Sequence, residues 1–186
     1  MNLRLKKKKS GFTLVEIIFY ISILAILLVV AVNFLTGLIR AQKKAEIHRK
    51  VWENADYALR RVIFEIENAE SVYACSTCPS VFDDDAGYLS LETAVLTPTG
   101  ETTTYIDLYL NSADSRLYIK REGLEAEPIT SDDVEVTKFH IKDLAFNAYN
   151  IPTSLQIEIT VKQKGEPTKS EYRAETTLLT TASIKH

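Results

Sequence analysis

The pattern of hydrophobic positions divides the chain into three stretches. From Ile17 to Ile39 there is no charged residue, and these 23 positions would span roughly 35 Å as a helix, enough to cross the hydrocarbon core of a bilayer. Apolar residues then recur at alternating steps of four and three, without proline or glycine from Leu38 to Ser71, which predicts that the helix continues. Past residue 71 the period changes to two, as in β-strands.

One helix from about Phe12 to about Ala69 is therefore expected. Its first half would face lipid or a helix bundle, and its second half would pack one stripe of residues on a globular domain. The residues predicted to form that stripe are Ala41, Ala45, His48, Trp52, Ala55, Leu59, Val62, Ile66 and Ala69. Within it, His48 and Trp52 are interpreted as packing residues rather than as ligands of any group.

Six short segments after residue 71 alternate and are rich in β-branched and aromatic residues. They are residues 88–96, 104–110, 116–122, 134–141, 155–163 and 172–182. Residues 111–115 and the stretch around Gly165 and Pro167 are predicted to be loops between strands. Strands that follow one another without intervening helices indicate antiparallel meanders, so the predicted fold class is α+β, with one long helix laid on an antiparallel β-sheet.

The N-terminal charges predict how the chain lies in a membrane. Arg4 and Lys6, Lys7, Lys8 and Lys9 supply five positive charges before the apolar run. A secretory signal begins in the same way, but residues 31–41 offer no small-residue cleavage site after the run. The positive-inside rule keeps the lysines in the cytoplasm and places the chain after about residue 40 on the other side. We therefore expect a single-pass inner-membrane protein whose C-terminal bulk lies outside the cytoplasm.

The segment KSGFTLVEII, residues 9–18, resembles the class III leader of type IV pilins and type II secretion pseudopilins. The resemblance implies that prepilin peptidase cuts between Gly11 and Phe12, and that the same enzyme methylates the new amine of Phe12. Lys6 to Lys9 would be the basic part of the leader. The implied partners are prepilin peptidase, other pilin or pseudopilin subunits, the inner-membrane assembly platform and the lipid bilayer, and no cofactor is implied.

Glu16 is a carboxylate inside the apolar segment, five residues into the implied mature chain. A lone acid in hydrocarbon costs a few kcal/mol and usually has a partner. Cleavage would expose a cationic amine at Phe12, and stacked subunits would bring that amine to Glu16 of another chain. Such a buried pair favours one axial register more than it adds net stability. Alternatively, Glu16 lies near the cytoplasmic face and reaches the lipid headgroups.

The resemblance extends to an organisation of the whole chain. It implies a cleaved leader at 1–11, a transmembrane and filament-core helix at 12–39, an amphipathic second half of the helix at 40–70 and an extracytoplasmic β-rich domain at 71–186. Residues 59–72 and 129–141 resemble the minor pseudopilin J and W-type minor pilins, and the absence of proline from the apolar helix favours a minor subunit. The function implied is that of a non-enzymatic minor pilin or pseudopilin, in a priming or tip complex.

A function of another class is also open. The helix could remain uncleaved and merely anchor an extracytoplasmic binding or sensor domain. In that case the leader would persist, and Gly11 could be replaced by a bulky residue without consequence. The compact arrangement of Gly11, Phe12 and Glu16 argues against this alternative, because an anchor does not need it.

Two further clusters could carry chemistry. Cys75 and Cys78 are expected to form a disulfide in an extracytoplasmic compartment, while a thioredoxin-like motif would need a βαβ context and a zinc site about four ligands. Asp83, Asp84 and Asp85 could bind calcium through their oxygens, but their spacing does not match an EF-hand. We expect a solvated acidic turn there, with no metal, and we interpret Asp132 and Asp133 in the same way.

Composition disfavours an enzyme and a nucleic-acid-binding protein. The 186 residues include only six glycines, and no phosphate-binding glycine loop, nucleophile elbow or zinc-protease motif is present. The formal net charge is −3. Loss of the five basic leader residues from 22 Lys plus Arg would leave 17 against 25 Asp plus Glu, a net charge of −8, which repels phosphate.

Overall fold

The computed structural model describes residues 11–73, 80–94, 102–146, 152–165 and 173–184. The chain divides into two compact units, Met1–Lys43 and Lys44–His186. The first unit contributes the N-terminal part of helix α1, and the second contributes the C-terminal part of that helix and all the strands.

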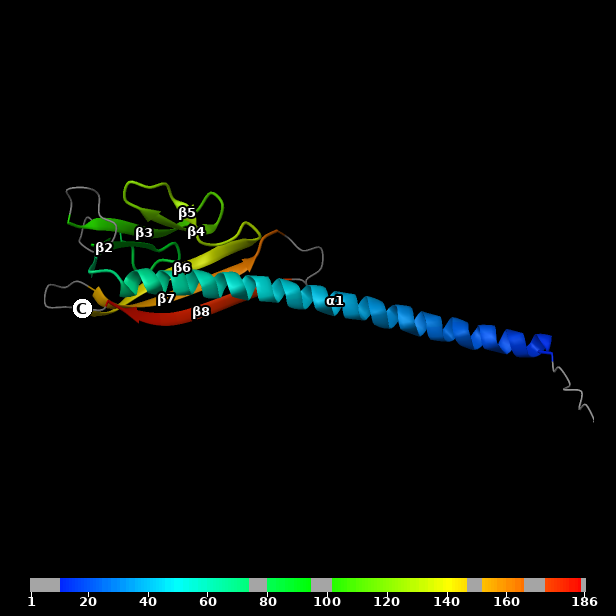
Figure 1. The fold of residues 1–186 in the computed structure, drawn as a ribbon. Helices are drawn as coiled ribbons and strands as arrows, with labels where there is room; N and C mark the ends of the chain where they lie inside the picture. Colours follow the sequence, from blue (N-terminus) through cyan, green and yellow to red (C-terminus); the bar gives the residue numbers. More distant parts are fainter. Residues whose placement is uncertain (1–10, 74–79, 95–101, 147–151, 166–172, 185–186) are drawn as a thin grey trace, which may run out of the picture. The chain divides into compact units, whose positions relative to one another are not determined.

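Helix α1 runs from Leu14 to Glu67 (Figure 1), so the predicted helix is confirmed to within two residues at each end. All its residues as far as Lys43 are exposed. By length and composition, α1 could cross a membrane. At its C-terminus the Phe64 carbonyl accepts from the backbone N–H of Asn68 at 3.2 Å and from the side-chain amide of Asn68 at 2.7 Å, and these bonds close the last turn.

In the second unit, one face of α1 is buried. Its buried apolar residues are Val51, Ala55, Ala58, Leu59, Val62 and Ile66. His48 is exposed and Trp52 is 49% exposed, so the prediction that these two residues pack in the stripe was wrong. The buried residues Val51, Ala55, Ala58 and Val62 recur at the same steps of four and three, but on a face that lies further round the helix than the predicted stripe. Val51 is on this face, and Trp52, the next residue, is about 100° away from it around the helix.

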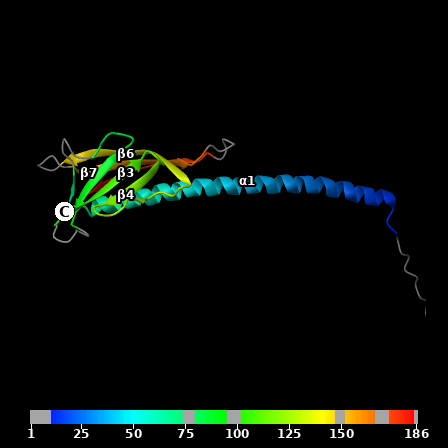
Figure 2. The same cartoon turned by 90° about the horizontal axis from the view of Figure 1, so that it is seen from above.

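The predicted α+β class, with one long helix on antiparallel β-structure, is confirmed, although the strands form two sheets rather than one. The first sheet has the order β1-β2-β3-β4-β5, with β1 at Ser71–Val72, β2 at Tyr88–Thr93, β3 at Thr104–Asn111, β4 at Arg116–Arg121 and β5 at Glu127–Pro128. The predicted loop at 111–115 is confirmed, because it joins β3 to β4 and Ser115 N–H donates to the Asn111 carbonyl at 2.9 Å. Both sheets lie alongside the C-terminal half of α1 (Figure 2).

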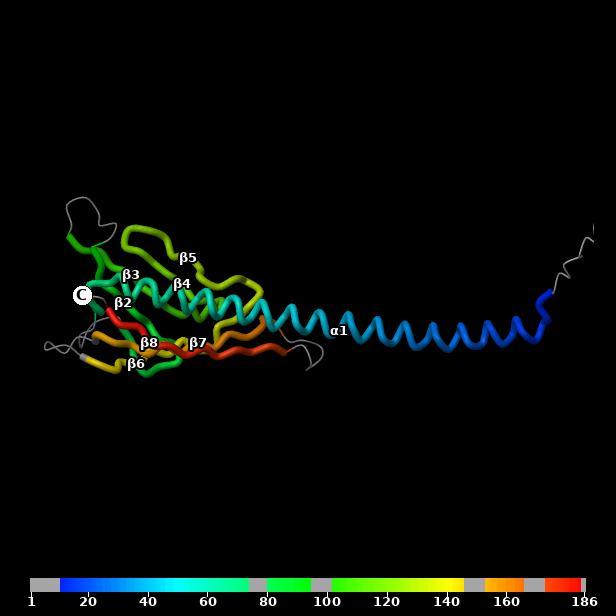
Figure 3. The backbone as a smooth tube through the Cα atoms, turned by 60° about the horizontal axis from the view of Figure 1, so that its bottom comes forward, coloured from blue at the N-terminus to red at the C-terminus, as the bar shows by residue number. Residues whose placement is uncertain are grey.

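The second sheet has the order β6-β7-β8 (Figure 3), with β6 at Val134–Phe146, β7 at Pro152–Gln163 and β8 at Glu175–Ser183. A register shift between Val136 and Lys138 inserts one extra residue into β6. Val136 and Phe139 are therefore both buried although they are three positions apart and would point to opposite faces of a regular strand, as a β-bulge allows. The two sheets and α1 share one hydrophobic core.

The segment that leads into β2 ties the two sheets together. Ala86 forms a parallel bridge with Phe139, and Gly87 N–H donates to the Phe139 carbonyl at 2.8 Å. A Cβ atom at Gly87 would meet that carbonyl oxygen at 2.6 Å, closer than real Cβ atoms approach. Glycine is therefore required here for the close approach of two backbones.

Candidate functional site

The candidate cleavage site lies just before helix α1. Gly11, Phe12 and Thr13 have no regular secondary structure and are exposed. A Cβ atom at Gly11 would meet nothing within 4 Å, so nothing in this chain's own packing requires glycine there. The ring of Phe12 is 71% exposed and meets the Tyr20 ring edge-on at 6.2 Å. The peptide bond between Gly11 and Phe12 thus lies in accessible, non-helical backbone.

Thr13 caps the N-terminus of α1, a role that our interpretation of the sequence had missed. Glu16 N–H donates to Thr13 Oγ1 at 3.3 Å, and Ile17 N–H donates to the Thr13 carbonyl at 3.2 Å. The spacing Thr-x-x-Glu is that of a capping box, in which the acid can bond back to the N-cap N–H. The sequence already contained this signal, because Thr13 and Glu16 are three positions apart in the motif.

Glu16 places a carboxylate in the first turn of α1. An acid in the first turn stabilises a helix by about 0.3–1 kcal/mol through the helix dipole when it is exposed. Within the described part of the chain, Glu16 forms no ion pair. A charged partner for it would therefore have to come from outside these residues.

The other predicted site residues give a mixed result. Lys6 to Lys9, Cys75 and Cys78 lie outside the described residues, so the leader charges and the disulfide stay predictions. Asp132 and Asp133 are exposed. Among the described residues, no group of three histidines, cysteines or acids is placed to hold a metal ion.

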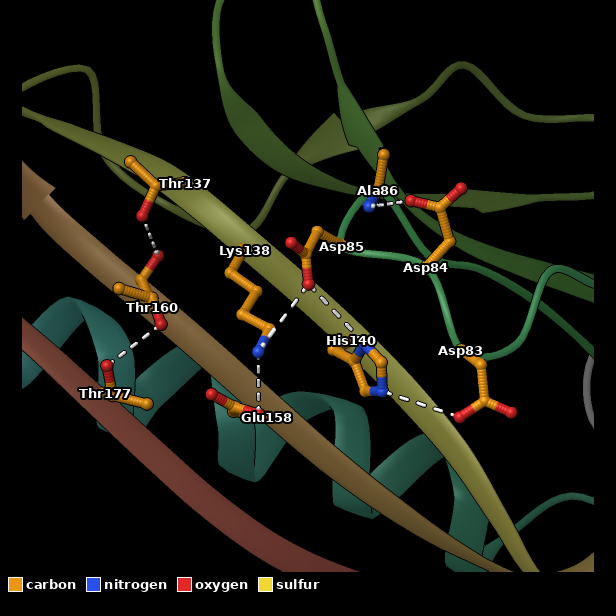
Figure 4. A network of polar contacts seen from close by, with 10 residues as sticks. All are labelled: Asp83, Asp84, Asp85, Ala86, Thr137, Lys138, His140, Glu158, Thr160 and Thr177. Carbon is orange, nitrogen blue, oxygen red and sulfur yellow. Dashed lines mark hydrogen bonds and ion pairs between the residues drawn. The ribbon is translucent and has the colours of Figure 1, made fainter.

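The acidic turn at Asp83, Asp84 and Asp85 contacts strand β6, as Figure 4 shows. Asp85 Oδ1 lies 3.6 Å from both Lys138 Nζ and His140 Nδ1, and Asp83 Oδ1 lies 3.7 Å from His140 Nε2. Asp84 instead accepts a hydrogen bond of 3.0 Å from Ala86 N–H. The turn is solvated, as predicted, but it is also held to the second sheet by charge, which the sequence did not reveal.

Lys138 is the cation at the centre of this network. Its Nζ lies 3.0 Å from Glu158 Oε2, and the hydrogen bond to Glu158, against some burial, raises the pKa of Lys138 above its ordinary value. Both the turn and the neighbouring strand β7 therefore favour the protonated lysine. Backbone bonds also hold the turn to β6, because Asp83 N–H donates to the Ile141 carbonyl and Phe139 N–H donates to the Asp85 carbonyl, each at 2.8 Å.

Glu65 is a buried acid of α1 that lies outside the stripe predicted from the sequence. Its side chain is 4% exposed, and its Oε1 atom lies 2.9 Å from Arg61 Nη2 and 2.8 Å from Arg121 Nη2. Arg121 comes from β4, so this cluster links the last turn of α1 to the first sheet. The sequence alone could not predict this cluster, because it does not show that β4 packs near the end of α1.

A row of three tyrosines crosses the first sheet and was also missed. Tyr88 and Tyr109 are stacked with centroids 5.6 Å apart, and Tyr109 and Tyr118 with centroids 6.0 Å apart. Burial, followed by a hydrogen bond to Asp107, raises the pKa of Tyr88 well above its ordinary value. The strand register, which brings these residues opposite one another, could not be obtained from the alternating pattern alone.

The raised pKa of Tyr88 predicts a loss of stability in alkali. The unfolded chain releases a phenol proton near pH 10, whereas folded Tyr88 retains its proton. The stabilisation is therefore complete below about pH 10 and is lost as the pH rises toward the folded pKa. We expect the free energy of unfolding of Tyr88→Phe, measured by urea denaturation between pH 8 and pH 12, to fall less steeply than that of the wild type.

Tyr57→Phe, an exposed position on α1, is the matched control for that measurement and should follow the wild-type slope. If the free energy of unfolding fell with pH equally in the wild type and in both variants, Tyr88 would not be the source of the loss of stability in alkali.

Comparison with known proteins gives one positive finding. Residues 6–32 match the family model described as the prokaryotic N-terminal methylation motif, which includes Gly11, Phe12 and Glu16. No curated protein matches the chain, and no solved structure matches it.

Proposed function

The motif at residues 6–32 is the signature of type IV pilins and pseudopilins, and from it we propose that the protein is a minor subunit of a type IV pilus or a type II secretion pseudopilus. It is made as a membrane-anchored precursor with the C-terminal domain outside the cytoplasm. Prepilin peptidase cuts after Gly11 and methylates the amine of Phe12. The mature subunit has no catalytic role and joins other subunits through the inner-membrane assembly platform, in a priming or tip complex.

The observation that carries this proposal is the motif, and the geometry of its cleavage site supports it. A peptidase must reach the backbone on both sides of the bond that it cuts, and helical backbone is closed to it by internal hydrogen bonds. Gly11 and Phe12 are exposed and precede the first helical residue, Leu14. The bond is therefore open to an enzyme without any unfolding of α1.

Assembly would follow from the properties of the apolar helix. Its residues as far as Lys43 are exposed in the isolated chain, so the apolar face needs lipid in the precursor and neighbouring helices in a filament. Glu16 lacks an ion partner among the described residues, and the methylated amine of Phe12 on another subunit would supply one. The pair would then select one axial register of the subunits.

The test is N-terminal and intact mass spectrometry of the protein recovered from its own host, with and without prepilin peptidase. We expect a mature chain that begins at a singly methylated Phe12 when the peptidase is present, and the full precursor when it is absent. A Gly11→Leu variant should accumulate as precursor in both backgrounds.

An intact leader in peptidase-positive cells would overturn the proposal. The uncleaved anchor of an extracytoplasmic binding or sensor domain would then be the function to pursue. In that case Gly11→Leu would have no effect on the length of the chain.

A further inference from the structure

The outward face of the first sheet presents its side chains in three rows across strands β2, β3 and β4. The strand register sets the rows: Tyr88, Tyr109 and Tyr118 in the first, Ser90, Asp107 and Lys120 in the second, and Glu92 and Tyr105 in the third. Glu122 extends the third row, because its N–H bonds to the Tyr105 carbonyl at 3.0 Å. The alternate residues on these strands, such as Leu89, Leu108 and Ile119, are buried in the core.

The middle row is the floor of a groove. The hollow measures about 350 Å³ and is lined by Tyr73, Ser90, Tyr105, Asp107, Lys120, Glu122 and Gly123. Tyr73 forms part of its aromatic side, because its ring lies 5.1 Å from the Tyr105 ring at an angle of 59°. This volume is within the range of about 300–1,000 Å³ that is typical of small-molecule sites.

The lining combines flat apolar surfaces with donors and acceptors. The rings of Tyr73 and Tyr105 offer aromatic faces, on which the C–H face of a pyranose ring can stack. Asp107 and Glu122 are acceptors, although Glu122 Oε2 already accepts from Thr104 Oγ1 and from Tyr105 N–H, both at 3.2 Å. Lys120 is a donor that forms no ion pair with another described residue. Sugar hydroxyl groups both donate and accept hydrogen bonds, so they can use both kinds of group.

The charges of the face select among ligands. Three carboxylates, those of Glu92, Asp107 and Glu122, stand against the single ammonium group of Lys120, which disfavours anionic ligands such as nucleic acids and acidic polysaccharides. The three outward rows contain no aliphatic residue, whereas the centre of a protein interface is typically apolar. A neutral ligand that is flat and rich in hydroxyl groups fits these properties best.

We propose that this groove binds a neutral glycan of β-1,4-linked pyranose units. Such a chain is extended and flat, and neighbouring strands about 4.8 Å apart provide a straight path across β2, β3 and β4. Cross-strand aromatic pairs also stabilise a sheet, which accounts for stacked Tyr88, Tyr109 and Tyr118. Polar residues are also usual on the solvated face of an antiparallel sheet, so the proposal rests on the hollow and on the aromatic side that Tyr73 and Tyr105 give it. The inference does not depend on the proposed assembly role.

The test uses the full chain in a detergent without a sugar headgroup, because a glycoside detergent would compete for the groove. Cellotetraose and chitotetraose are titrated by calorimetry, with saturation-transfer NMR to identify the bound face. The two probes distinguish a plain from an N-acetylated amino-sugar chain. We expect at least one to bind, and tetragalacturonate, which is anionic, to bind more weakly.

Substitutions in the groove locate the binding. Tyr105→Ala should raise the dissociation constant of the tetrasaccharide about tenfold, because one stacking contact is lost. Tyr105→Phe retains the ring and should bind the tetrasaccharide with nearly the wild-type affinity. Tyr57→Ala removes an exposed tyrosine from α1 and should leave binding unchanged. Should Tyr105→Ala unfold, as judged by circular dichroism, Lys120→Ala at an exposed position replaces it, with an expected loss of a few-fold.

Three results would overturn the proposal. The first is that neither tetrasaccharide binds the folded wild type at millimolar concentration. The second is that the groove variants bind the tetrasaccharides as the wild type does. The third is that tetragalacturonate binds more tightly than the neutral probes. Protection of Tyr105 from solvent only in assembled filaments, without sugar binding, would instead assign the groove to a subunit interface.

Discussion

Glu16→Gln is expected to lower incorporation of the protein into filaments by about a hundredfold while leaving its membrane insertion unchanged, because an unpaired amine would remain buried at a cost of about 3 kcal/mol. Glutamine retains the shape of the side chain and can still hydrogen-bond to the Thr13 N–H, as a capping box permits. The substitution thus removes the charge alone. Incorporation is measured as the ratio of the variant in purified filaments to the variant in membranes.

Thr13→Ala separates the two roles of Glu16. It removes the oxygen that accepts the Glu16 N–H and should cost about 1 kcal/mol of helix stability, but it leaves the carboxylate in place. We expect only a small loss of incorporation. If Thr13→Ala and Glu16→Gln reduced incorporation equally, or if Glu16→Gln had no effect, the pairing between subunits would be refuted and Glu16 would be a capping residue.

Glu65→Ala is expected to destabilise the folded protein by about 2–3 kcal/mol. Removal of one partner from a buried ion pair costs about 3–5 kcal/mol because it leaves charge without compensation, and we reduce that figure because Arg61 and Arg121 are partly exposed. Glu65 lies in the last turn of α1, where the helix dipole disfavours an acid. Its presence there depends on the two arginines. Urea denaturation of the full chain, followed by circular dichroism, measures the effect.

The matched control is Glu53→Ala. Glu53 also pairs with an arginine of α1, Arg49, but both side chains are exposed, so the loss should be within about 0.5 kcal/mol. Equal effects of the two substitutions would show that Glu65 contributes no more than a surface pair.

The sequence predicted the elements of the fold better than their arrangement. The ends of α1 and the positions of β3, β4 and β7 were close to those observed, because periodicity and turn residues are local signals. The division into two sheets was missed, since β5 and β6 are consecutive strands that do not pair. The local sequence pattern of a strand does not show whether it pairs with the preceding strand or begins a new sheet.

The same limit applies to the sites. Gly11, Phe12 and Glu16 lie within one short motif, so the sequence alone was enough to predict roles for them. Glu65 and Arg121 are 56 positions apart, and the groove joins residues from β2, β3 and β4, whose contact depends on register. The error at Trp52 has another cause, because a large apolar side chain was preferred over Val51, its smaller neighbour, and both positions fit a step of four or three residues from Ala55.

Strand order has a consequence for the kinetics of folding. In both sheets the order in space follows the order along the chain, so each pairing closes a comparatively short loop and the contact order of the strand pairs is low for a β-rich domain. Low contact order favours fast folding. A domain that has to fold after its strands emerge one by one could therefore complete β1 to β5 before β6 exists. The bonds between β6 and earlier segments, such as Val136 N–H to the Ser115 carbonyl and the bridge of Ala86 to Phe139, and the core that the two sheets share would have to wait for the rest of the chain.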